Sequence, residues 1–342
     1  MGHRAGVNGD TNDLGHIRWP GSAHEASRFI LAQLPGSDPI EGSDSDPARY
    51  GRSEEPPEIV TASLLSDDTF RAIDVGDPKL PRTSGFAAFL DGTQDVRIVN
   101  HAAGIPIVFA KVSAAVRARV NRRLIAWPKA PPSVRKRYYV PFRYVSGMSS
   151  GFKSHPDVVD TARSDAAGKF PSRHPAALME AAVKCIQRDR EMIELELAHR
   201  WSNAESSALY VDGSITGSES AARSSNVVGV IKTHRRLYAD GDAFRVLVSL
   251  TAGQRTSIFK VAPERRHPVA SWYVRLRASK GRDVLFGLVR VEAALGSDIE
   301  SRADEISRWI IAEGSPLALP DGRWDKMAYG IRDTEEFLRA IS

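Results

Sequence analysis

Two aspartates are the residues of this chain best placed for chemistry, because each follows a short apolar run and precedes a glycine. The runs are Phe86–Leu90 before Asp91 and Ala208–Val211 before Asp212. Short apolar runs bounded by glycine and polar residues predict buried strands, so each aspartate is expected where a strand leaves the sheet. A carboxylate at that position faces the edge at which open α/β sheets bind ligands.

Paired carboxylates of this kind predict a site for a hard divalent cation, which binds oxygen ligands and keeps several waters. Asp-Gly is also a common turn dipeptide, so either aspartate alone is explained as well by a turn. The repetition of the arrangement in two strands favours a shared ion site.

The longest helical pattern, Ala176–Trp201, leads directly into the strand that ends at Asp212. Its apolar residues recur at a spacing of three to four, namely Leu178, Ala182, Cys185, Ile186, Ile193, Leu197 and Trp201. Glu194 falls at the edge of this apolar face, and Glu191 and Glu196 are the other candidates. A charged helix face is the ordinary meaning of such a run. The nearby strand raises the expectation that one glutamate belongs to the site.

Lys232 follows a second apolar run, Val227–Ile231, and is a candidate for a site at the ends of these strands. A lysine that merely ends a strand is an equally good interpretation. Tyr273 and His267 are weaker candidates for the same site.

Basic residues form two clusters whose interpretation stays open. One lies in Val116–Ile125 and holds Arg117, Arg119, Arg122 and Arg123; the other is Arg135–Tyr139, which combines basic and aromatic residues. Such clusters contact phosphate or stack on single-stranded nucleic acid. They are explained as well by a solvated face in the first case and a partly buried strand in the second.

The composition indicates a globular protein with a sizeable core, since 42% of the 342 residues are hydrophobic. The formal net charge of +5 is only a weak indication of nucleic-acid binding. Cys185 is the single cysteine, which excludes an internal disulfide and a cysteine-rich zinc site and suits a reducing cytoplasm. No apolar run approaches the length of a membrane span, so we expect a soluble, cytoplasmic protein with no membrane partner.

The chain is expected to consist of a flexible arm at 1–57 and an α/β domain at 58–342. The arm is rich in Gly, Ser, Asp, Pro and Glu, with one short helix possible at His24–Leu34. Within the domain, 128–170 is predicted to be a loop-rich insertion, and Ile59–Asp74 has an amphipathic helical pattern.

Strands are expected to outnumber helices in the domain. The apolar runs Phe86–Leu90, Val96–Asn100 and Ile105–Val112 predict an antiparallel meander joined by turns. Further strands are predicted at Phe244–Leu250 and Arg255–Val261, and others follow toward the C-terminus.

The ordered set of motifs resembles the NurA nucleases. Leu90–Thr93, Val211–Ile215 and Val228–Lys232 match that family in order and character, with the glutamate-bearing helix between the first two. Trp272–Leu276 and Val289–Glu292 are similar to the later strands of the family. The resemblance does not include the N-terminal arm. Because each motif is short, the resemblance depends on the order of the whole set.

The resemblance implies an RNase H-like mixed sheet flanked by helices, and metal-dependent nuclease action on DNA ends. It implies two Mn²⁺ or Mg²⁺ ions held by Asp91, Glu194 and Asp212, with Asp91 between them and Lys232 near the scissile phosphate. It also implies a homodimer that acts with a HerA-type hexameric ATPase in DNA repair or antiviral defence.

Two departures from the family matter. The distance along the chain from Asp91 to the helix is longer than expected, and the C-terminal site histidine of the family has no clear match, since the last histidine is His267. A catalytically silent DNA-binding or regulatory subunit of a HerA-type motor is therefore the alternative function. A third hypothesis is an unrelated α/β protein whose Asp-Gly pairs are turns.

Overall fold

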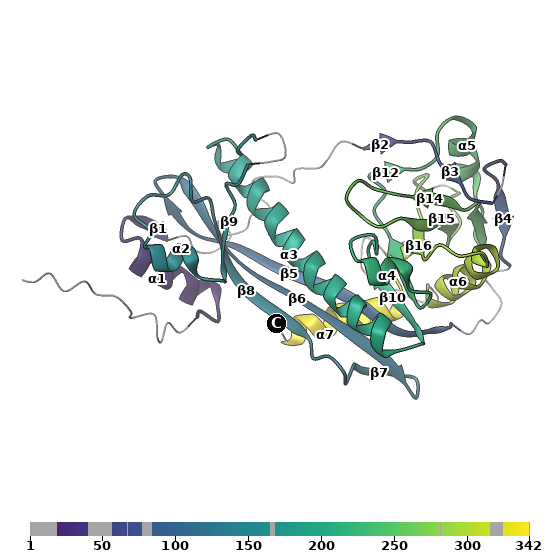
Figure 1. Ribbon diagram of the computed structural model, residues 1–342, viewed down its shortest axis with the longest axis horizontal. Helices are drawn as coiled ribbons and strands as arrows, with labels where there is room; N and C mark the ends of the chain where they lie inside the picture. The colour runs from purple at the N-terminus through teal and green to yellow at the C-terminus, as the bar shows by residue number, and fades with distance from the viewer. Residues whose placement is uncertain are drawn as a thin grey trace, which may run out of the picture. The chain divides into compact units, whose positions relative to one another are not determined.

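The structure, a computed structural model, describes residues 19–39, 57–66, 68–76, 84–164, 168–280, 282–314 and 324–341. These residues form two compact units, with the elements labelled in Figure 1. The first unit contains the described part of 1–53 together with 95–111 and 135–187, and the second contains the described part of 54–94 together with 112–134 and 188–342. The strands β5 (Phe86–Ala102), β6 (Ile105–Val120) and β8 (Ser133–Val140) and the helix α3 (Pro175–Ala204) have residues in both.

The second unit is built on a mixed sheet. Its strands are hydrogen-bonded in the order β3 (Ser63–Leu64), β14 (Phe259–Val261), β15 (Val269–Arg275), β16 (Leu288–Ala293), β11 (Val227–Ile231), β10 (Ala208–Asp212), β5 and β6. Strand β10 is parallel to both β5 and β11, whereas β16 is antiparallel to β11 and β15. The remaining strands of this unit are β2 (Glu58–Ile59), β4 (Ala72–Asp74), β7 (Arg123–Ala126), β12 (Arg236–Leu237) and β13 (Gln254–Thr256).

The second unit also contains several helices. They are α4 (Glu219–Arg223), α5 (Gly241–Ser249), α6 (Ile299–Glu313), the 3-10 turn Trp324–Lys326 and α7 (Tyr329–Ile341). Of these, α6 and α7 share an apolar cluster with the sheet. Ala303, Ile306 and Ile310 recur on one face of α6, as an amphipathic helix requires, and they share the cluster with Trp272 and Val291 of the sheet. The predicted fold class, α/β with a mixed sheet and flanking helices, is confirmed.

The first unit has its own core. It contains α1 (Ala23–Gln33), β1 (Ser37–Pro39), α2 (Ser150–Ser154) and β9 (Val158–Asp160), besides parts of β5, β6, β8 and α3. Residues of the predicted insertion at 128–170 therefore supply strands and a helix to this unit. Tyr138 and Tyr139 of β8 are fully buried, so the Arg135–Tyr139 cluster is a partly buried strand.

The predicted meander is corrected at its first turn. Phe86–Leu90 and Val96–Asn100 belong to one strand, β5, which continues through Asp91 and Gly92. Asp91 therefore lies inside a strand, whereas Asp212 is the last residue of β10 as predicted. The turn that does exist joins β5 to β6, where Ala103 and Gly104 both have positive φ.

Two further predictions of local structure are wrong. Phe244–Leu250 lies largely in helix α5, because a short apolar run does not distinguish a strand from a helix. Ile59–Asp74, expected to be helical, contains the short strands β3 and β4. In the second case pairing with distant strands decides the structure, since β3 pairs with β14 and β4 with β13.

The predicted flexible arm is corrected over residues 19–39. Helix α1 confirms the short helix expected at His24–Leu34, and its Ala26 and Ile30 are completely buried in the core of the first unit. Strand β1 pairs antiparallel with β5. Spaced apolar residues in α1 supply the packing that the average composition of the arm does not indicate. The rest of the predicted arm lies outside the described residues, apart from Pro57.

No helix in the described part of the chain combines the length and the apolar character needed to cross a membrane.

Candidate metal centre

The parallel pair of β5 and β10 brings Asp91 and Asp212 together. Val211 lies opposite Leu90 in the register of this pair, so the next residue on each strand is an aspartate. Leu90 and Val211 are buried, which fixes the register, because a shift by one residue would turn each strand's buried face outward. The two carboxylates are therefore neighbours by the pairing of the strands themselves.

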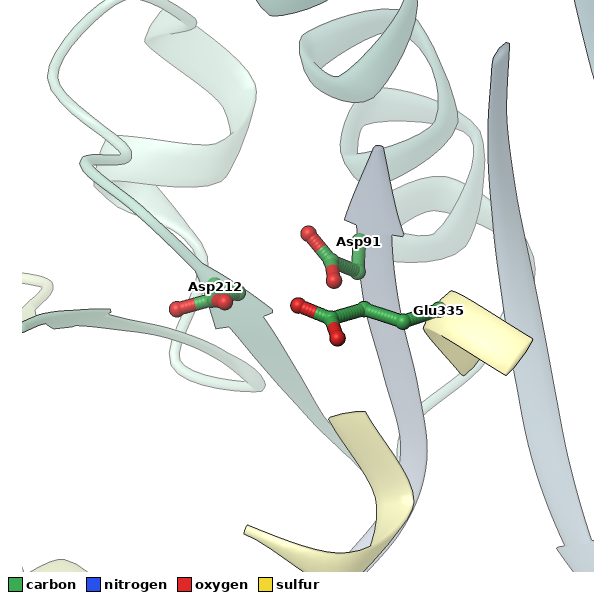
Figure 2. Close-up of side chains that lie close together, drawn as sticks. All are labelled: Asp91, Asp212 and Glu335. Carbon is green, nitrogen blue, oxygen red and sulfur yellow. The ribbon is translucent and has the colours of Figure 1, made fainter. Parts of the chain in front are cut away.

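A third carboxylate, Glu335 of α7, completes a compact acidic cluster with these aspartates. One carboxylate oxygen from each of Asp91, Asp212 and Glu335 lies within 4.8 Å of the others. Figure 2 shows the three side chains gathered at one place, from β5, from the end of β10 and from α7. This is the spacing at which oxygen ligands meet around one divalent cation.

Asp91 is the most constrained member of the cluster. It is 6% exposed, and its Oδ1 accepts a hydrogen bond of 2.7 Å from the Gly92 amide. Its buried Oδ2 has no hydrogen-bond partner among the residues that the structure describes. Burial raises the pKa of Asp91 well above its ordinary value, and the charges of Asp212, Glu194 and Glu335 raise it further, while Lys232 lowers it. A cation at Oδ2 would satisfy this oxygen and offset the accumulated negative charge.

Glu194 of α3 packs against the strand at Gly92. A Cβ atom at residue 92 would lie 2.1 Å from Glu194 Oε1, so only glycine leaves room for this carboxyl group. Gly92 is thus required by close packing and not by a turn. Burial raises the pKa of Glu194 to about 7, with Asp212 and Glu191 adding to the rise and Arg190 opposing it. Glu194 therefore lies beside the aspartates but outside the compact group of three.

The other two glutamates considered on α3 are engaged elsewhere. Glu191 forms an ion pair of 2.7 Å with Arg266, and Glu196 forms one of 2.6 Å with Arg200 on the same helix. Of the three glutamates, Glu194 is the one that lies beside the aspartates.

Lys232 supplies the positive charge nearest to the cluster. Its Nζ donates a hydrogen bond of 2.8 Å to Asp212 Oδ2, and its side chain is only 5% exposed. It follows β11, whose Val230 lies opposite Asp212 in the parallel pair. One ammonium group therefore partly offsets the nearby carboxylates, which leaves the site with an excess of negative charge.

The loop that follows Asp212 is fixed by a buried glutamate of β16. Glu292 is completely buried, and its Oε2 accepts hydrogen bonds from Ser214 Oγ at 2.8 Å and from the Ile215 amide at 3.0 Å. Arg290 forms an ion pair with the other oxygen at 2.9 Å. These bonds hold the loop next to Asp212 in one arrangement.

Tyr273 and His267 do not join the cluster. The hydroxyl of Tyr273 accepts a hydrogen bond from the Tyr238 amide, and burial raises its pKa to about 12. The backbone amide of His267 donates to Thr216 O, which places it beside the loop after Asp212.

The arginines of Val116–Ile125 divide into two kinds. Arg117 pairs with Asp333 and Arg119 with Glu313, each at 2.8 Å, so both hold the second unit together. Arg122 and Arg123 are exposed at the turn between β6 and β7. Only the second pair is available to a phosphate group in solution.

Glu335 is the site residue that sequence reasoning missed. The residue has no motif of its own in the sequence. The usable signal was the strong amphipathic pattern of α7, in which Glu335 lies on the face of the buried Ile331 and Leu338.

Comparison of the chain with protein-family models gives no match, and comparison with curated proteins at a stringent threshold gives none.

Proposed function

We propose that this chain is a metal-dependent DNA nuclease that hydrolyses phosphodiester bonds. The observation that carries the proposal is the convergence of Asp91 and Asp212 around a buried Asp91 oxygen that has no partner among the described residues. Burying uncompensated carboxylates is costly, so such an arrangement suits a bound cation. The ordered motifs that resemble the NurA nucleases supply the substrate class.

The residues of the site fit Mn²⁺ or Mg²⁺, because the ligand atoms brought together are all carboxylate oxygens. Asp91 and Asp212 would hold the metal, with Glu194 flanking them. Bound divalent ions supply activation of water and neutralisation of the charge that develops on the phosphate oxygens.

The chain's own side chains provide the remaining steps. Lys232, held beside Asp212, contributes a positive charge toward a nonbridging phosphate oxygen. Glu194, which lies beside the aspartates, can accept a proton from the attacking water when its carboxyl group is ionised. The fixed loop after Asp212 keeps that carboxylate in place during the reaction.

The setting of the reaction follows from the resemblance. We infer a cytoplasmic enzyme that acts as a homodimer with a HerA-type hexameric ATPase in the processing of DNA ends, in repair or in antiviral defence. The ATPase would deliver the DNA, and the carboxylate site would cleave it.

The test compares Asp91→Asn and Asp212→Asn with the wild-type protein, and uses Asp95→Asn as the matched control. Asp95 lies on the same strand as Asp91, but its side chain is 59% exposed. Each site variant removes one charge that attracts the metal, so degradation of DNA with Mn²⁺ or Mg²⁺ is lost. DNA binding in a low-salt gel shift is retained, since the basic side chains that attract phosphate are unchanged. The control variant cleaves and binds like the wild type.

Two outcomes contradict the proposal. Cleavage by both site variants at the wild-type rate would show that the aspartates are not catalytic. If the wild-type protein degrades no DNA with either metal, alone or with the cognate ATPase, the catalytically silent subunit replaces the nuclease.

A further inference from the structure

Glu335 is held in the acidic cluster by the packing of the last described helix. Ile331 lies one turn before it and Leu338 almost one turn after it, and both are completely buried. Gly330 lies directly against the ring of Phe89, since a Cβ atom there would be 2.2 Å from Phe89 Cδ2. The absence of a side chain at residue 330 therefore lets α7 approach β5 closely enough for Glu335 to reach Asp91.

A cation from β6 fixes a second face of α7. Arg117 Nε donates to Asp333 Oδ1 at 2.8 Å, and its guanidinium group lies 4.4 Å from the centre of the Phe337 ring. Such a contact combines an ion pair with a cation–π interaction. The position of Glu335 is thus set by apolar packing and by Arg117, independently of any attraction within the acidic cluster.

Arg339 of the same helix pairs with Glu335 at 3.9 Å, but repulsion among the ionised carboxylates of the cluster opposes this position when no cation is bound. Glu335 is 7% exposed and Asp91 is 6% exposed, and one oxygen of each lies within 4.8 Å of the other and of Asp212. Carboxylates this close repel one another when both are ionised. The buried Asp91 Oδ2, which has no hydrogen-bond partner among the described residues, is an independent sign that a ligand belongs at this point.

The chemistry of the donors narrows the identity of that ligand. The group brought together here consists of three carboxylates, with no imidazole or thiolate among them. Carboxylate oxygens suit Mg²⁺ and Mn²⁺, whereas imidazole and thiolate ligands suit Zn²⁺ and other softer ions. A histidine at residue 335 would therefore raise the affinity for Zn²⁺ relative to Mg²⁺, compared with the carboxylate that is there.

We propose that Glu335 is the third protein ligand of the ion site, and that its carboxylate gives the site a weaker preference for Zn²⁺ over Mg²⁺ or Mn²⁺ than an imidazole at the same place would. The proposal rests on the proposed function only in assuming that Asp91 and Asp212 bind a divalent ion. It assigns to α7 a direct part in the site, supplied from the far end of the chain.

The experiment measures the binding of Mg²⁺, Mn²⁺ and Zn²⁺ by titration calorimetry, in the absence of DNA, for the wild type, Glu335→Gln, Glu335→His and Glu336→Gln. Glu336 is the matched control, because it is the next residue of the same helix, is 59% exposed and pairs with Arg332. Glu335→Gln weakens Mn²⁺ and Mg²⁺ binding by about ten-fold or more, since even the outer partners of metal ligands have effects of that size. Glu336→Gln binds like the wild type.

Glu335→His shifts the ratio of Zn²⁺ affinity to Mg²⁺ affinity in favour of Zn²⁺ by about ten-fold or more, because imidazole replaces a carboxylate. Thermal unfolding in chelator shows whether each variant is folded, and Glu335→Gln should be at least as stable as the wild type there.

Wild-type Mn²⁺ affinity in Glu335→Gln, together with loss of binding in Asp91→Asn, would overturn the role of Glu335 and leave the proposed function standing. An unchanged preference among the ions in Glu335→His would overturn the role in selectivity. If the wild-type protein binds no divalent ion, both this inference and the proposed function fail.

Discussion

Glu194→Gln should stabilise the protein in the absence of divalent ions, and only at neutral to alkaline pH. Glu194 is 12% exposed, and burial together with Asp212 and Glu191 raises its pKa from an ordinary 4.5 to about 7. The folded state therefore binds more protons than the unfolded state between these values, so this group makes folding less favourable as the pH rises through the window. Glutamine resembles the protonated glutamate and does not titrate.

The size of the effect follows from the two pKa values. One pKa unit corresponds to about 1.4 kcal/mol, so moving from pH 5 to pH 8 should change the stability difference between variant and wild type by roughly 2 to 3 kcal/mol. Most of the change falls between pH 5 and pH 7, and the difference levels off at about pH 8. Saturating Mn²⁺ should reduce or reverse the advantage of the variant, because the ion stabilises the ionised carboxylate.

The assay is urea unfolding in chelator at pH 5 and pH 8, followed by tryptophan fluorescence, for the wild type, Glu194→Gln and Glu196→Gln. Glu196 lies on the same helix, but its side chain is 45% exposed and pairs with Arg200, so its variant should show little pH-dependent difference. The reasoning is refuted if the stability difference for Glu194→Gln is the same at both pH values, or if the wild type is the more stable protein at pH 8 in chelator.

Three further predictions concern packing and titration. Gly92→Ala should displace Glu194 and lower the free energy of unfolding by about 1 to 3 kcal/mol. Gly36→Ala should be nearly neutral, because a Cβ atom there meets nothing within 4 Å. Equal effects of the two variants in thermal unfolding would contradict the close contact at Gly92. Burial lowers the pKa of His234 to about 4, so the unfolded state binds more protons than the folded state below pH 6.5. Between pH 7 and pH 5 the wild type should therefore lose roughly 2 kcal/mol more stability than His234→Gln. Parallel plots of unfolding free energy against pH for the two proteins would count against this. Deleting residues 1–39 should lower the melting temperature, because it removes Ala26 and Ile30 from a buried core. An unchanged melting temperature would show that α1 does not stabilise the protein.

The candidate site was predictable from sequence where local pattern determines position. Apolar runs before Asp91 and Asp212 specified two buried strands, and the spacing of Ile193 and Leu197 specified the face on which Glu194 lies. These features depend on residues next to one another in the chain or one helical turn apart.

The features that sequence reasoning missed depend on contacts between distant residues. Gly92 was interpreted as a turn residue, but its role comes from Glu194, which packs against it from α3. Glu335 joins the cluster because Gly330 lets α7 pack against Phe89, and no local pattern encodes that approach. In the predicted arm, an average composition rich in small and polar residues concealed the apolar face of α1.

The most direct test of the central claim is the location of bound Mn²⁺ in crystals of the wild-type protein grown or soaked with the ion, using its anomalous scattering. The account predicts a peak within about 2 to 2.6 Å of carboxylate oxygens of Asp91 and Asp212. For a two-ion site it predicts a second peak about 3.5 to 4 Å from the first, toward Glu194. The same crystals of Asp91→Asn should show neither peak at full occupancy. An ordered wild-type cluster with no Mn²⁺ between Asp91 and Asp212 at saturating concentration would contradict the claim that these carboxylates form a metal centre.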